Sequence, residues 1–77
     1  MNIKYINVAL NVNGESETVR LQEGAEVAEI RSNTELLEDL GAPTAYTFAV
    51  NGQGVSDDFI PQDGDVVTLR PLTSVKG

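Results

Sequence analysis

The sequence predicts an α+β fold in which a mixed sheet of four to five strands is covered on one face by a single helix. Two observations support this prediction. Alternating apolar residues followed by Asn13-Gly14 indicate an N-terminal β-hairpin. After Gly24 the apolar residues recur every three to four positions, which indicates a helix. Because only one amphipathic helix is present, that helix must cover the sheet of a single small domain.

The hairpin is predicted from strands over residues 3–12 and 15–21, joined by Asn13-Gly14. Asn and Gly tolerate positive φ, which a two-residue hairpin loop requires. This loop places apolar side chains opposite one another on one face of the two strands, which favours the register. The expected pairs are Ile6 with Leu21, Val8 with Val19, Leu10 with Glu17 and Val12 with Glu15.

One helix is predicted from about Ala25 to Leu40, with an irregularity near residues 32–33. The alternative is a turn over 25–31 followed by a helix over 33–40. Ser32 followed by Glu35 fits a capping box, and Gly41 supplies a left-handed C-terminal cap. The apolar face of the helix comprises Val27, Ile30, Thr34, Leu37 and Leu40.

Three further strands are predicted: Ala45 to Val50, a short strand near Val55, and a last strand after Asp63-Gly64-Asp65. The last strand should lie beside the first and fray near Pro71, which cannot donate to a sheet ladder. The predicted core consists of Ile6, Val8, Leu10, Val19, Leu21, Val27, Ile30, Leu37, Leu40, Phe48, Val50, Ile60, Val67 and Leu69.

Composition excludes several classes of function. The chain has 12 acidic and 5 basic residues, a formal charge of −7, so nucleic acid and anionic membranes are not expected as partners. It has no His and no Cys, so no nucleophile–base set can be assembled and no enzyme activity or cofactor is expected. The aspartates Asp57, Asp58, Asp63 and Asp65 lack calcium-loop spacing and are interpreted as turn-forming and solvated acids. A cytoplasmic monomer is expected.

One face of the sheet is predicted to dock a protein partner. Strand alternation turns Val67 and Leu69 towards the helix, which leaves Val66, Thr68 and Arg70 on the open face. Arg20 should share this face, so two arginines lie on it in an otherwise acidic protein. From the first two strands the face also receives Tyr5, Asn7, Ala9, Asn11 and Thr18.

The chain resembles the ubiquitin-like β-grasp proteins. The closer resemblance is to the sulfur carriers of molybdopterin and thiamine biosynthesis (molybdopterin synthase small subunit and thiamine sulfur carrier) and their prokaryotic ubiquitin-like relatives. It covers essentially the whole chain, in the order of elements and in four stretches. These are E-G-A-E-V-A-E-I at 23–30, F-A-V-N-G at 48–52, D-G-D-V-V-T-L-R-P at 63–71, and the final Gly77.

The resemblance implies that an E1-like enzyme, with its own bound ATP, adenylates the carboxylate of Gly77. The acyl-adenylate then takes up sulfur as a thiocarboxylate, or passes to a lysine of an acceptor protein. Gly lacks a Cβ and can enter a narrow channel. The family ends in Gly-Gly, whereas Lys76 precedes Gly77 here. The alternative is a β-grasp module that binds its partner without covalent attachment; Gly77 favours the carrier and Lys76 favours the module.

The sequence divides into a domain over residues 1–72 and a flexible tail formed by Thr73, Ser74, Val75, Lys76 and Gly77. The tail has few apolar groups to offset the ordering entropy, about 1–2 kcal/mol per residue for the backbone alone. We therefore expect amide order parameters, measured by NMR relaxation, to fall after Leu72. Rigid values through Val75 would instead show that the tail packs on the domain.

Overall fold

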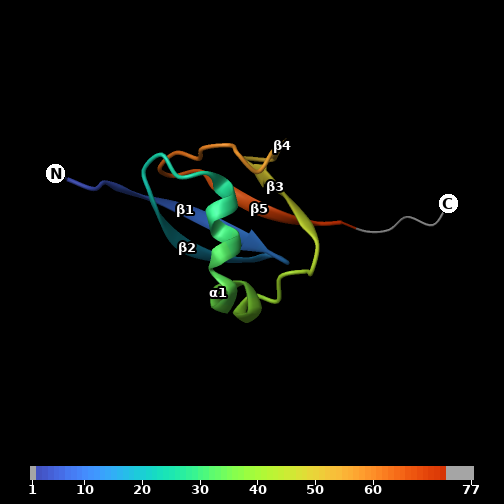
Figure 1. Ribbon diagram of the computed structural model, residues 1–77. Helices are drawn as coiled ribbons and strands as arrows, with labels where there is room; N and C mark the ends of the chain where they lie inside the picture. Colours follow the sequence, from blue (N-terminus) through green and yellow to red (C-terminus); the bar gives the residue numbers. More distant parts are fainter. Residues whose placement is uncertain (1, 73–77) are drawn as a thin grey trace.

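The computed structural model describes residues 2–72, in which a five-stranded mixed sheet carries two short helices on one face (Figure 1). The tail predicted over Thr73–Gly77 lies outside the described residues. The sheet order is β2-β1-β5-β3-β4. In chain order the elements are β1 (Tyr5–Val12), β2 (Glu15–Gln22), the 3₁₀ helix η1 (Val27–Ser32), α1 (Thr34–Asp39), β3 (Tyr46–Val50), β4 (Gln53–Val55) and β5 (Val66–Pro71).

The N-terminal hairpin has the predicted loop and register. Asn13 and Gly14 both adopt positive φ, at 53° and 82°. Val8 pairs with Val19, and Ile6 pairs with Leu21. The predicted pairs Leu10 with Glu17 and Val12 with Glu15 are also present.

Strand β5 lies at the centre of the sheet, parallel to β1 and antiparallel to β3. Its approach to β1 is fixed by the turn before it, where the backbone N–H of Asn7 donates to Asp63 Oδ1 at 2.8 Å. The N–H of Gly64 donates to the Asn7 carbonyl at 2.8 Å. β5 ends at Pro71 as predicted, and Leu72 then donates one more backbone bond, to the Ala45 carbonyl.

The prediction of one continuous helix is wrong. η1 and α1 are separated by Asn33, whose φ of −88° and ψ of 67° are not helical. The alternative, a turn over 25–31 followed by a helix over 33–40, is closer to the structure, although the first segment is a 3₁₀ helix and α1 begins at Thr34. Ser32 is not the cap of α1, because Asn33 occupies that position and makes no side-chain capping hydrogen bond. Gly41 does take the expected left-handed conformation, at φ 72°.

The first backbone N–H groups of η1 are satisfied by a distant loop and not by a capping side chain. Val27 donates to the Phe59 carbonyl at 2.7 Å, and Ala28 donates to the Asp57 carbonyl at 3.1 Å. These bonds, made by a loop about thirty residues later, hold the start of η1 against the sheet. They supply a tertiary reason for a short 3₁₀ helix here.

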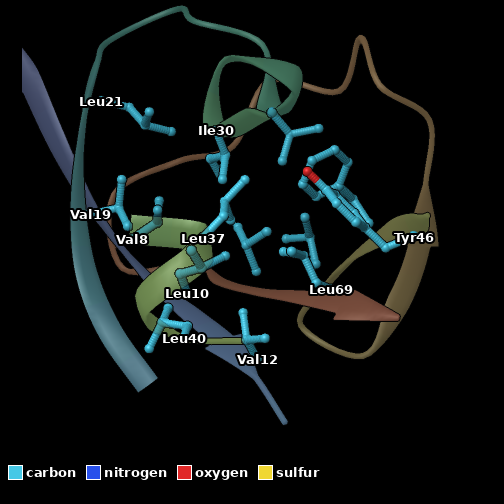
Figure 2. Packing of buried hydrophobic residues seen from close by; sticks show 14 of the residues in the cluster. Val8, Leu10, Val12, Val19, Leu21, Ile30, Leu37, Leu40, Tyr46 and Leu69 are labelled. Carbon is cyan, nitrogen blue, oxygen red and sulfur yellow. The ribbon is translucent and has the colours of Figure 1, made fainter. Parts of the chain in front are cut away.

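The core lies between the sheet and the helices, where Leu37 and Ile30 meet Val8, Leu10 and other strand residues (Figure 2). Thirteen of the fourteen predicted core residues are buried. The prediction for Ile60 is wrong: it is 50% exposed, while its neighbour Phe59 packs against the core from a loop. Buried hydrophobic residues that the prediction omitted are Val12, Tyr46 and Ala49.

Leu37 provides a test of the helical face. Its side chain is 9% exposed, so Leu37→Ala should lower the free energy of unfolding by about 2–5 kcal/mol, since it leaves a cavity under α1. Denaturant melts measure this change. Leu72→Ala is the matched control, because the same truncation at a 60% exposed side chain should cost roughly 0.5 kcal/mol or less. Equal costs for the two variants would contradict the assigned packing.

Candidate functional site

The face of the sheet opposite the helices is the candidate site. The register places Ala9 of β1 between Thr18 of β2 and Val66 of β5. The next row runs from Asn11 through Thr68 to Ala49. Because alternate residues of a strand share a face, these side chains lie opposite the residues of the core cluster. Ala49 is nevertheless covered, at 0% exposure. The face therefore consists mostly of small and polar side chains.

The structure brings the four predicted docking residues onto this face but does not cluster them. Val66, Thr68 and Arg70 follow one another along β5, whereas Arg20 lies on β2, beyond β1. The guanidinium carbon of Arg20 lies 4.7 Å from the centre of the Tyr5 ring. Arg70 Nη2 donates to the Gly52 carbonyl at 3.0 Å, in the turn between β3 and β4. Their role in docking remains a prediction.

Three exposed apolar side chains lie on or beside this face. Tyr5 is 52% exposed and Val66 is 39% exposed, although both belong to strands. Leu72 is 60% exposed, and its backbone N–H bond to Ala45 holds it beside the start of β3. Leu72, the last described residue, therefore exposes an apolar side chain. The predicted activation residue, Gly77, and the rest of the tail lie outside the described residues.

Thr47, which is not among the predicted docking residues, also belongs to the face. It pairs with Arg70 across β3 and β5 and is exposed. The signal was present in the sequence. Phe48 and Val50 of this strand belong to the predicted core, so alternation turns Thr47 to the opposite face. Thr47 extends the polar surface next to Arg70.

Within residues 2–72 no group of three or more carboxylate, His or Cys side chains lies close enough to hold a metal ion. Across the same span no polar or charged residue is buried. None of the helices in this part of the chain has the length and apolar character to cross a membrane. A flat, solvated face of this kind suits contact with another protein surface.

Comparison with solved structures identifies the fold. A de novo protein designed on the basis of ubiquitin superposes with a TM-score of 0.70, at 18% identity over 95% of both chains. The putative molybdopterin converting factor subunit 1 from Pyrococcus furiosus superposes with a TM-score of 0.64. It is 27% identical, and the alignment covers 87% of this chain and 99% of that one. The ubiquitin of Caldiarchaeum subterraneum is 16% identical, with a TM-score of 0.55 and 92% and 100% coverage.

These similarities show that the chain has a ubiquitin-like β-grasp fold, as the sequence resemblance indicated. The fold's five-stranded mixed sheet and short helices are those described above. No protein-family model matches the chain, and no curated protein matches it in sequence.

Proposed function

We propose that this chain is a small ubiquitin-like carrier or modifier that an E1-like adenylating enzyme activates at Gly77. The main support for the proposal is the similarity to the molybdopterin converting factor subunit. That protein has the same fold and is 27% identical over 87% of this chain. In this fold the central strand β5 leads directly into residues 73–77. The enzyme would recognise the domain over residues 2–72 and act on the carboxylate of Gly77.

The partner enzyme supplies all the catalytic groups for the proposed reaction, and this chain supplies the reacting carboxylate. A carboxylate oxygen of Gly77 attacks the α-phosphate of ATP, pyrophosphate leaves, and a mixed anhydride with AMP forms. A sulfur nucleophile or a lysine amine then attacks the carbonyl carbon, and AMP leaves. Activation is needed because a free carboxylate is a poor electrophile. This chain supplies the carboxylate, the narrow Gly77 backbone and a surface for docking.

The open face is the surface that we assign to this docking. Val66 at the start of β5 and Leu72 just after its end offer exposed apolar area, and Arg70 lies between them in sequence. The chain as a whole is strongly acidic, with a formal charge of −7, whereas the face carries Arg20 and Arg70. An enzyme with a basic rim and a patch that accepts Arg70 would be complementary to it. Thr68 and Arg20 complete the proposed contact.

A non-covalent binding module is the second candidate function. Lys76 favours it, because a long charged side chain next to Gly77 fills a channel that a Gly-Gly ending leaves open. In this case the same sheet face would hold the partner, and the tail would not react. Adenylation therefore distinguishes the two candidates, and binding alone does not.

The first test measures activation. The 77-residue chain should support ATP–pyrophosphate exchange by a candidate E1-like enzyme from the same organism, because reversal of adenylation returns labelled pyrophosphate to ATP. Deletion of Gly77 should abolish exchange, whereas Lys76→Gly should retain or increase it. The domain of both variants should keep its amide chemical shifts. Exchange that persists without Gly77, or binding without any exchange, would contradict activation at this residue.

The second test concerns docking. Arg70→Glu should weaken binding of the E1-like enzyme by about threefold to thirtyfold, since it reverses a charge at the proposed contact. Isothermal titration calorimetry gives the affinity, and amide chemical-shift mapping locates the contact. Lys4→Glu is the matched control, because it makes the same change of charge at an exposed residue just before β1.

If the shifts change only around Glu29, Glu35 and Glu38 on the helix side, and Arg70→Glu binds normally, the enzyme docks on the opposite face.

A further inference from the structure

Two turns of this chain have nearly the same sequence and the same backbone conformation. V-N-G-E at 12–15 joins β1 to β2, and V-N-G-Q at 50–53 joins β3 to β4. The φ angles are 53° and 82° at Asn13 and Gly14, and 52° and 87° at Asn51 and Gly52. All four residues are exposed. Apart from the chain neighbours of each glycine, no described atom lies within 4 Å of the position that a Cβ would take there.

The side chain of Asn51 is held at both ends. Its Oδ1 accepts from the Val66 N–H at 3.0 Å, and its Nδ2 donates to Asp65 Oδ1 at 3.1 Å. The backbone N–H of Asn51 donates to the Val66 carbonyl at 2.8 Å. Arg70 Nη2 donates to the carbonyl of the next residue, Gly52, at 3.0 Å. Rotation of the Asn51 side chain therefore breaks two hydrogen bonds within a turn that is fixed on both sides.

The side chain of Asn13 is held by a single hydrogen bond. Its Nδ2 donates to the Gly41 carbonyl at 3.0 Å, just after the end of α1. Within residues 2–72 its Oδ1 accepts no hydrogen bond from another residue. Asn13 and Gly41 are both exposed, so water replaces this bond when it opens. The Asn13 side chain thus rotates at a lower cost than that of Asn51.

An asparagine followed by glycine can lose its side-chain amide without an enzyme. The glycine backbone nitrogen loses its proton and attacks the asparagine Cγ. The bond from Cγ to the amide nitrogen breaks, ammonia leaves, and a cyclic succinimide forms. Water then opens the ring at either carbonyl, which gives aspartate or isoaspartate. The net change is the uptake of water and the loss of ammonia, and glycine favours it because no Cβ hinders the attack.

We propose that Asn13 is a site of spontaneous deamidation and that the fold protects Asn51 from the same reaction. The attack requires the side chain to turn its Cγ towards the next backbone nitrogen. This movement breaks one exposed hydrogen bond at Asn13 and two hydrogen bonds at Asn51. The same dipeptide in the same turn conformation therefore reacts at different rates, because of the residues that hold each side chain.

Deamidation at position 13 acts on the contact between the hairpin and α1. It replaces the Nδ2 donor by a carboxylate oxygen, which faces the Gly41 carbonyl and is repelled by it. Isoaspartate also lengthens the backbone of a two-residue loop by a methylene group, which the tight turn does not accommodate. The reaction thus releases the tip of the hairpin from the end of α1.

This inference does not depend on Gly77 or on activation by an enzyme. Asn13 lies in the loop between β1 and β2, whereas the proposed enzyme contact follows β5. An absence of deamidation at Asn13 would therefore leave the proposed carrier function unaffected.

Peptide mapping by mass spectrometry tests the proposal on the 77-residue chain. After incubation at mildly alkaline pH, cleavage after Lys and Arg places the two asparagines on separate peptides, residues 5–20 and 32–70. Fragmentation then locates each conversion of amide to acid. Asn13 should convert at least about threefold faster than Asn51, because conversion of Asn51 breaks one more hydrogen bond. Equal rates, or faster conversion of Asn51, would overturn the proposal.

The same measurement in denaturant is the matched control. The two sites share V-N-G and differ at the next residue, which is Glu15 in one and Gln53 in the other. The unfolded chain should therefore convert them at similar rates. If the difference between the sites persisted in denaturant, the local sequence and not the fold would select Asn13, and the proposal would fail.

Asp65→Ala tests the protection of Asn51. It removes the acceptor of Asn51 Nδ2 and should raise the rate at Asn51 about threefold or more relative to Asn13. Asp58→Ala is the control, because this exposed aspartate bonds to Ser56 and not to Asn51. Amide chemical shifts establish that each variant is folded. An unchanged ratio of rates in folded Asp65→Ala would contradict the assigned protection.

Asn13→Asp reproduces one product of the reaction. It should raise the equilibrium constant for unfolding by about threefold to tenfold, because the bond to Gly41 is lost. It should also shift the amide signal of Ala42, whose peptide group contains the Gly41 carbonyl. Gln22→Glu makes the same change from amide to acid on an exposed residue of β2 and should do neither. An unshifted Ala42 signal in Asn13→Asp would overturn the proposed release of the hairpin.

Discussion

The structure depends on the parallel contact between β1 and β5. This ladder has only three residue pairs, Ala9 with Val66, Leu10 with Val67 and Asn11 with Thr68. It nevertheless joins the N-terminal hairpin to the rest of the sheet across more than fifty residues of sequence. Closing so long a loop has an entropic cost, which bonds between β1 and the turn before β5 help to offset. The Asn7 N–H donates to Asp63 Oδ1 and the Gly64 N–H donates to the Asn7 carbonyl, which fixes the alignment of the two strands. The open face and the core take their positions from this contact.

Features set by neighbouring residues were predictable from the sequence. The Asn13-Gly14 turn and the alternation of apolar residues determine the hairpin register, because a slip of one residue would turn Val8 and Val19 out of the core. The irregularity near residues 32–33 was predictable, but the 3₁₀ helix before it was not. At its start the N–H groups of Val27 and Ala28 donate to carbonyls of the loop at residues 57–59, and the local sequence of residues 25–40 does not indicate these partners. Ile60 was assigned to the core for a similar reason: in a loop without alternation, an apolar side chain has no fixed face.

In the candidate site, too, some features follow from neighbouring residues and others depend on tertiary structure. Alternation alone places Val66, Thr68 and Arg70 on one face, since it requires only that β5 is a strand. The positions of the two arginines relative to each other could be known only from the sheet order, which places β1 between the strands of Arg20 and Arg70. The contacts of Arg31 also depend on tertiary structure. Its guanidinium lies 4.6 Å and 4.8 Å from the Tyr46 and Phe48 ring centres and pairs with Asp57, 26 residues away. Stacking of this kind requires the planar group of arginine, and lysine would not replace it.

The central position of β5 has a consequence for biosynthesis. β5 is the last strand in the chain but the third of five in the sheet. The hairpin emerges from the ribosome first, yet its β1 edge has no partner until residues 66–71 have been made. Folding of this domain must therefore wait for nearly all of it to be synthesised. A chain that stops before Val66 exposes the facing edges of β1 and β3, which are targets for aggregation and degradation. Cells would thus accumulate domains that include the strand leading to the C-terminal residues, and remove those that lack it.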